Sequence, residues 1–171
     1  FNTRGTCSPR GCSEGHFEEG VGEVADVQAA MDFVAERGLP NPWLVGWSFG
    51  TELTLKYGSR PPIADQIKGA VLLSPPLHRA DDADLDAWAA TGLPLRVLVP
   101  EFDDYLRPAE AAERFARVPQ ATLVPVEGAK HLWVGEKFVR RAHQEIVDAV
   151  LGAGAPVLPT EVTGPVALAK G

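Results

Sequence analysis

A serine lies between two glycines at the end of a short apolar run. The segment Gly46-Trp47-Ser48-Phe49-Gly50 fits the pattern G-x-S-x-G. The apolar residues 43–45 before it predict a buried strand, and residues 49–57 after it predict a helix. A serine on such a strand-to-helix turn is held on a strained backbone, and flanking glycines avoid a steric clash. We therefore expect Ser48 to be a nucleophile whose hydroxyl projects from the turn.

The start of the following helix favours negative charge beside Ser48. Backbone N–H groups and the helix dipole meet at a helix N-terminus, where they can stabilise an oxyanion. The N–H of Phe49 is the predicted donor. The side chains of Trp47 and Phe49 flank the serine and either line an acyl pocket or pack in the core beneath the turn. The sequence leaves both alternatives open.

A serine hydroxyl needs a base, and His131 is the best placed of the four histidines. When a Ser-His-Asp triad follows a G-x-S-x-G turn, the acid and then the histidine come after the serine. His131 follows a predicted strand at residues 121–126. Of the others, His16 precedes the serine, His78 precedes every candidate acid, and His143 lies within the last predicted helix. His131 is therefore the predicted base.

The acid should follow an earlier strand, and three carboxylates compete for the role. Glu101, Asp103 and Asp104 all come directly after the predicted strand at residues 95–99. Asp103 is the preferred acid because Glu101 comes too soon after Pro100. Asp104 remains the alternative, since a shift of the turn by one residue would exchange it with Asp103.

These candidates need a scaffold of alternating strands and helices. Apolar strands are predicted at residues 43–45, 70–73, 95–99 (ended by Pro100) and 121–126, with a strand end at residues 1–4. Helices are predicted at residues 23–37, 49–57, 84–90 and 108–116, followed by a long one whose apolar face carries Phe138, Ala142, Ile146 and Val150. This alternation predicts an α/β fold with a mostly parallel sheet and helices on both faces.

Composition limits the partners. The 171 residues are 45% hydrophobic and 23% charged, with a formal net charge of −7, which argues against nucleic acid. No apolar stretch approaches ~20 residues, so we expect no membrane span and a cytoplasmic location. Cys7 and Cys12 are expected to be reduced thiols, with a local disulfide as the alternative. Together with His16 they do not form a recognised zinc spacing, so neither metal nor cofactor is expected.

Five segments together resemble small bacterial α/β-hydrolases, most closely the lid-poor serine esterases similar to dienelactone hydrolases. They are Asn2-Thr3-Arg4-Gly5, Ser13-Glu14-Gly15, Gly46-Trp47-Ser48-Phe49-Gly50, Asp103 before Tyr105-Leu106, and Gly128-Ala129-Lys130-His131. The resemblance covers residues 1–151 and implies a catalytic domain there. It also implies a Ser-His-Asp hydrolase of ester or similar acyl bonds. Residues 152–171, rich in Pro, Gly and Ala, are expected to form a poorly ordered tail.

The chain departs from these relatives in two ways. Its loop between Gly5 and Ser13 is longer and carries both cysteines. Relatives also carry about three strands before the position of Phe1, and a loop after one of them supplies a second oxyanion N–H. We therefore expect an α/β-hydrolase fold without the N-terminal strands, from a fragment of a longer protein or from a degenerate domain.

The expected function is hydrolysis of a small carboxylic ester, or of a related acyl bond such as a thioester, through an acyl-enzyme. The alternative is a non-catalytic α/β-hydrolase-like binding or scaffold domain. The order of serine, acid and histidine favours the enzyme, whereas the absent strands favour the alternative. A small-molecule substrate is the expected partner, and self-association into a homo-oligomer is left open.

Overall fold

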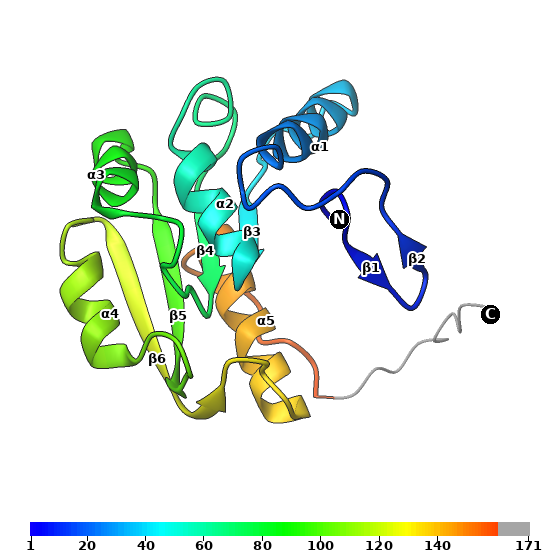
Figure 1. Cartoon of the computed structure of the whole chain (residues 1–171). Helices are drawn as coiled ribbons and strands as arrows, with labels where there is room; N and C mark the ends of the chain where they lie inside the picture. Colours follow the sequence, from blue (N-terminus) through cyan, green and yellow to red (C-terminus); the bar gives the residue numbers. More distant parts are fainter. Residues whose placement is uncertain (161–171) are drawn as a thin grey trace.

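A computed structural model describes residues 1–160, which form a parallel sheet with helices packed against it (Figure 1). The elements, in chain order, are β1 (Cys7–Ser8), β2 (Gly11–Cys12), α1 (Val24–Glu36), β3 (Leu44–Trp47), α2 (Phe49–Gly58), β4 (Ala70–Leu73), α3 (Asp82–Thr91), β5 (Leu95–Phe102), α4 (Pro108–Phe115), β6 (Ala121–Lys130) and α5 (Glu136–Leu151). The order in the main sheet is β3-β4-β5-β6, and each neighbouring pair is parallel. The predicted fold class is confirmed.

The parallel arrangement places all four carboxyl ends at one edge of the sheet. Each of β3, β4 and β5 is followed by a helical connection that returns the chain to the start of the next strand. Loops that follow neighbouring strands therefore meet at this edge, where ligand sites of open α/β sheets lie. Ser48 follows β3, and His131 follows β6.

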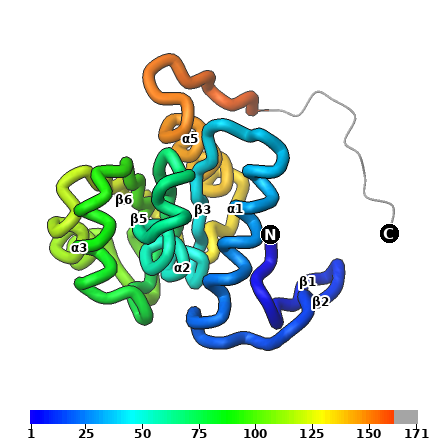
Figure 2. Tube along the Cα trace, turned by 90° about the horizontal axis from the view of Figure 1, so that it is seen from above, coloured from blue at the N-terminus to red at the C-terminus, as the bar shows by residue number. Residues whose placement is uncertain are grey.

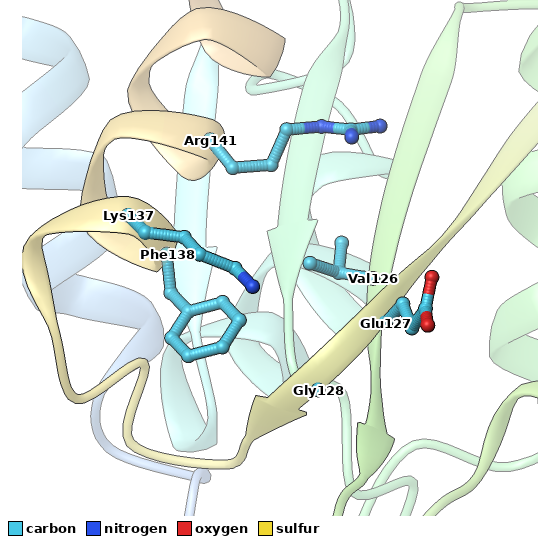
Figure 3. A pocket seen from close by; sticks show the side chains of 6 residues that line it. All are labelled: Val126, Glu127, Gly128, Lys137, Phe138 and Arg141. Atoms are coloured by element: carbon cyan, nitrogen blue, oxygen red, sulfur yellow. The ribbon is translucent and has the colours of Figure 1, made fainter.

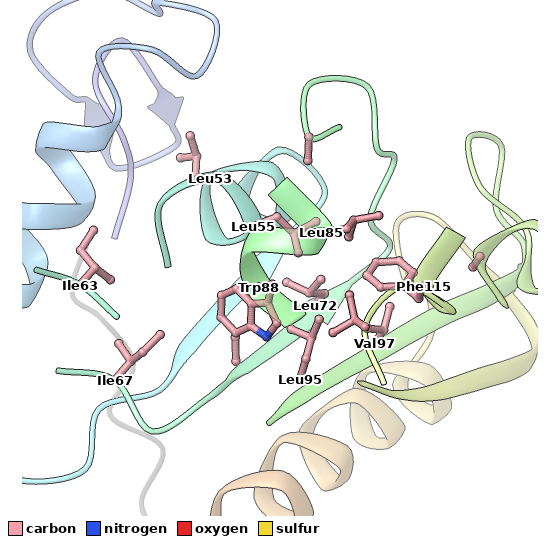
Figure 4. Packing of buried hydrophobic residues seen from close by; sticks show 14 of the residues in the cluster. Leu53, Leu55, Ile63, Ile67, Leu72, Leu85, Trp88, Leu95, Val97 and Phe115 are labelled. Carbon is pink, nitrogen blue, oxygen red and sulfur yellow. The ribbon is translucent and has the colours of Figure 1, made fainter. Parts of the chain in front are cut away.

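Two apolar clusters bury the opposite faces of the sheet. On one face, Leu72 and Val97 pack with residues of α2, α3 and α4, including the fully buried Trp88 (Figure 4). On the other, Val71 and Leu98 pack with α5. Figure 2, which views the molecule from above, shows α5 on one side of the strands and α2 and α3 on the other. Adjacent residues of a strand point to opposite faces, which explains why these strands are continuous apolar runs.

The N-terminal loop differs from its prediction. A strand end was expected at residues 1–4, but the first strands are β1 and β2, which pair as a short antiparallel hairpin. A disulfide between Cys7 and Cys12 closes the hairpin. The expectation of reduced thiols is therefore wrong for this structure. The two cysteines are directly opposite each other in the hairpin, which brings their side chains together.

Two strands run further than predicted. Pro100 was expected to end β5, yet the strand continues to Phe102 through an irregularity in its pairing with β6. Such an irregularity accommodates a residue that has no N–H to donate. β6 extends past Val126 to Lys130, so it leads directly into His131.

The segment at residues 152–160 lies against α5. Gln144 donates to the carbonyl of Pro156 and accepts from the N–H of Leu158. Arg140 donates to the carbonyls of Pro159 and Thr160. The rest of the expected tail, residues 161–171, lies outside the described residues. Within residues 1–160, no helix is both long enough and apolar enough to cross a membrane.

Candidate active site

Ser48 occupies a strained turn between β3 and α2, as predicted. Its φ of 50° and ψ of −115° lie in a region that non-glycine residues rarely adopt. Its N–H still donates to the carbonyl of Leu73 in β4, so the strand pairing holds the turn in place. Ser48 is also the N-cap of α2, whose first turn presents free N–H groups, including that of Phe49. The hydroxyl thus sits beside a helix N-terminus.

The two flanking glycines have different importance. A Cβ atom added at Gly46 would lie 2.4 Å from the carbonyl oxygen of Gly50, so the turn requires glycine at position 46. A Cβ atom added at Gly50 would meet nothing within 4 Å. The expectation that both glycines relieve a clash is therefore wrong for Gly50, because its own Cβ position faces open space.

The structure brings Ser48, His131 and Asp103 together in one hydrogen-bonded series. Nε2 of His131 lies 2.8 Å from Oγ of Ser48. Nδ1 of His131 lies 3.0 and 3.1 Å from the two carboxylate oxygens of Asp103. The side chains of Asp103 and His131 are only 1% and 10% exposed. The hydroxyl, imidazole and carboxylate are therefore connected in the order required for nucleophilic catalysis.

The three competing carboxylates have separate environments. Asp103 also accepts a hydrogen bond from the N–H of Tyr105 at 2.9 Å. Asp104 is exposed to solvent. Glu101 is half-buried and accepts from the N–H of Gly128 at 2.7 Å. Glu101 therefore holds the segment that leads to His131.

An aromatic side chain that the sequence did not single out covers His131. The ring of Tyr105 packs edge-on against the imidazole, with ring centroids 4.7 Å apart. The other edge-on contact of Tyr105 is with His78, at 5.1 Å. His78 follows β4 and shares the Tyr105 ring with His131, whereas His16 and His143 are exposed. Tyr105 lies only two residues after Asp103 in the sequence, and this proximity is the signal that could have indicated its place beside His131.

The side chains that flank Ser48 separate in space. The ring of Phe49 packs against Phe17 at a centroid distance of 5.1 Å, so it contacts the N-terminal loop. The guanidinium of Arg79 lies 5.7 Å from both rings. Trp47 is half-exposed, and its indole N–H donates to the main-chain carbonyl of His131 at 3.2 Å. Core packing therefore describes Phe49, which also packs against the larger apolar cluster, whereas Trp47 is half-exposed.

Two buried carboxylates fix the loops around the serine. Glu52 in α2 accepts from the backbone N–H groups of His78, Arg79 and Ala80. Glu23 accepts from the N–H groups of Glu18 and Gly20. Multiple donors compensate for the burial of each carboxylate. Glu52 therefore ties the loop after β4 to the helix that follows Ser48, and Glu23 ties residues 18–20 to the start of α1.

A separate cavity of about 480 Å³ lies between β6 and α5 (Figure 3). Lys137, Phe138 and Arg141 line it from α5, and Val126, Glu127 and Gly128 line it from β6. Arg141 is paired with Glu145, and Lys137 lies over the ring of Phe138.

Within residues 1–160, no group of three or more His, Cys, Asp or Glu side chains is arranged to hold a metal ion.

No protein-family model matches the sequence. An uncharacterised protein of Rickettsia prowazekii (strain Madrid E), RP471, is 31% identical over 96 residues, which are 54% of this chain and 39% of RP471.

Similar solved structures carry the names of hydrolases. An alpha-beta serine hydrolase homologue from Coxiella burnetii superposes with a TM-score of 0.67 at 21% identity. The match covers 85% of this chain and 65% of the Coxiella chain. The Pyrococcus furiosus esterase Pf2001 gives a TM-score of 0.68 at 16% identity, covering 82% and 65%. MGS-MChE2, an alpha/beta hydrolase enzyme from a sediment metagenome of the Mar Chica lagoon in Morocco, gives 0.53 at 20% identity, covering 70% and 68%.

The chain spans about 65% of the length of the first two of these structures. At these identities the likeness concerns the fold alone. The parallel order β3-β4-β5-β6, the strained serine turn and the structural neighbours together lead to one conclusion: this chain has the α/β-hydrolase fold.

Proposed function

We propose that this protein is a serine hydrolase that cleaves a small carboxylic ester, or a related acyl bond such as a thioester. The observation that carries the proposal is the continuous series from Ser48 Oγ through His131 to Asp103. Hydrolase and esterase structural neighbours support the same class. The closer likeness to dienelactone hydrolases stays a prediction.

In the proposed mechanism, Oγ of Ser48 attacks the carbonyl carbon of the substrate while Nε2 of His131 takes the hydroxyl proton. The carbonyl oxygen becomes an oxyanion, which the N–H of Phe49 stabilises at the start of α2. His131 then protonates the leaving group, and an ester links the acyl group to Ser48. Asp103 keeps Nδ1 protonated and stabilises the imidazolium.

Water completes the cycle. His131 takes a proton from a water molecule that attacks the acyl-enzyme, and it returns the proton to Oγ of Ser48 as the acid product leaves. Every proton transfer therefore passes through Nε2, the atom that lies nearest the hydroxyl.

The test is hydrolysis of short p-nitrophenyl esters by the full chain, with Ser48→Ala as the comparison. We expect the wild-type protein to release p-nitrophenolate and the variant to lose that activity while it keeps its circular-dichroism spectrum. A variant as active as the wild type would contradict the role of Ser48. A folded wild-type chain without turnover would favour a binding or scaffold domain.

A further inference from the structure

The main-chain carbonyl of His131 accepts two hydrogen bonds from the ends of two other strands. The indole N–H of Trp47, at the end of β3, lies 3.2 Å from this oxygen. The hydroxyl of Ser74, directly after β4, donates to the same oxygen at 3.2 Å. A carbonyl oxygen has two lone pairs, so these two donors saturate it.

Ser74 is itself held in one orientation. It is 1% exposed, and its oxygen accepts from the indole N–H of Trp133 at 2.9 Å. The hydroxyl therefore accepts one hydrogen bond from Trp133 and donates another to the carbonyl of His131. The φ of Ser74 is 52°, an unfavourable value for a residue with a Cβ atom. The backbone therefore adopts a strained conformation at the point where this hydroxyl is required.

The topology explains why His131 needs such an anchor. His131 follows β6, whereas Ser48 follows β3, and β4 and β5 lie between them. Strands in a sheet are about 4.8 Å apart, so the segment after β6 must cross roughly 14 Å to reach the serine. The 2.8 Å contact between Nε2 of His131 and Oγ of Ser48 therefore depends on how the main chain at His131 is positioned.

We propose that Ser74 and Trp47 are positioning residues that hold His131 against Ser48 through its main-chain carbonyl. This inference rests on the proposed hydrolase function, and it goes beyond the three residues of the triad. Neither residue takes part in bond making. They act by fixing the imidazole at hydrogen-bond distance, since small misplacements of reacting groups cost large factors in rate.

The test uses two variants of Ser74, which is too buried to contact a substrate. Ser74→Ala removes the hydroxyl and keeps the strained backbone. Ser74→Gly removes the hydroxyl but tolerates the positive φ. We expect both to lower kcat for p-nitrophenyl acetate about tenfold or more, with KM changed less than about twofold. If Ser74 served only the backbone, Ser74→Gly would keep the wild-type kcat.

Two further variants complete the set. Trp47→Phe keeps a ring but removes the indole donor, and we expect it to lower kcat in the same way as the Ser74 variants. Ser59→Ala is the matched control, because its hydroxyl donates to the carbonyl of Leu55 at the same 3.2 Å, at the far end of α2. Ser59→Ala should keep the wild-type kcat.

A fluorophosphonate probe separates this inference from the proposed function. Its rate of covalent labelling reports the activation of Ser48 without any turnover. If the folded wild-type chain is not labelled, the proposed hydrolase function itself is contradicted. Suppose instead that the wild-type chain is labelled, and that Ser74→Gly and Trp47→Phe fold and are labelled at the wild-type rate. That result would overturn the positioning role and leave the hydrolase proposal intact. Should Ser74→Ala fail to fold, these two variants still decide.

Discussion

Asp103 lies with Oδ2 3.0 Å from Nδ1 of His131, while its neighbour Asp104 is exposed to solvent. Two chemically identical side chains, adjacent in sequence, therefore have opposite environments. This pair provides a matched comparison for the role of the acid.

Asp103→Asn should lower kcat by about three to four orders of magnitude, because an amide no longer selects the tautomer in which Nδ1 carries the proton. Asp104→Asn should change kcat less than about twofold. Steady-state kinetics on p-nitrophenyl acetate checks both. If Asp103→Asn lost only a few-fold in kcat, the carboxylate would be a bystander.

The ring of Tyr105 should matter more than its hydroxyl. The ring packs against the imidazole of His131, and an edge-on aromatic pair contributes about 0.5–1.5 kcal/mol. We expect Tyr105→Ala to lower kcat about two- to tenfold, since the imidazole gains freedom to move. Tyr105→Phe retains the contact and should restore most of the rate. Equal losses in the two variants would show that the hydroxyl, rather than the ring, is responsible.

The glycines of the serine turn should respond differently to alanine. Gly46→Ala places a methyl group 2.4 Å from the carbonyl oxygen of Gly50, and relief of that overlap should cost about 1–3 kcal/mol in the free energy of unfolding. Gly50→Ala meets open space within α2, where alanine is the better helix former, so stability should be unchanged or slightly higher. Urea unfolding measures both, and equal midpoints for the two variants would contradict this geometry.

Acid should weaken the attachment of the N-terminal loop to α1, which is made by Arg4 and Asp26. Hydrogen bonds from Arg4 hold the pKa of Asp26 below its usual value, although partial burial acts in the opposite direction. The pKa of Asp26 is lower in the folded protein than in the unfolded chain. The ionised carboxylate therefore stabilises the folded protein fully at pH values above the unfolded-state pKa of about 3.9. That contribution is lost as the pH falls through the folded-state pKa.

Asp26→Asn should therefore be less stable than the wild type at pH 7, and the difference should shrink as the pH falls below about 4. Asp32→Asn, at an exposed position of the same helix, is the control. Urea midpoints measured across this pH range check the expectation. A difference independent of pH would show that the ion pair with Arg4 does not stabilise the loop.

The order of residues along the chain predicts much of the fold and the central contacts. The apolar run before Gly46, Asp103 after β5 and His131 after β6 predict which loops meet, because parallel strands end at one edge. The strand at Ala70–Leu73 begins and ends as predicted. These features depend on local pattern and topology, both of which are visible in a sequence.

Other features depend on side-chain orientation across the sheet. The bonds from Trp47 and Ser74 to His131 join residues 84 and 57 positions apart, and no local pattern indicates them. The pairing irregularity beyond Pro100 depends on β6. The disulfide depends on a hairpin that a glycine- and proline-rich loop did not suggest.

The most direct test of the account is the site at which a fluorophosphonate reacts. The full chain is incubated with the probe, digested and mapped by mass spectrometry, with Ser48→Ala and His131→Ala in parallel. We predict one labelled peptide that contains Ser48, no label in Ser48→Ala, and strongly slowed labelling in His131→Ala because the base is lost. Absence of label on Ser48 in the folded wild-type chain, or labelling that does not depend on His131, would contradict the central claim that this serine is an activated nucleophile.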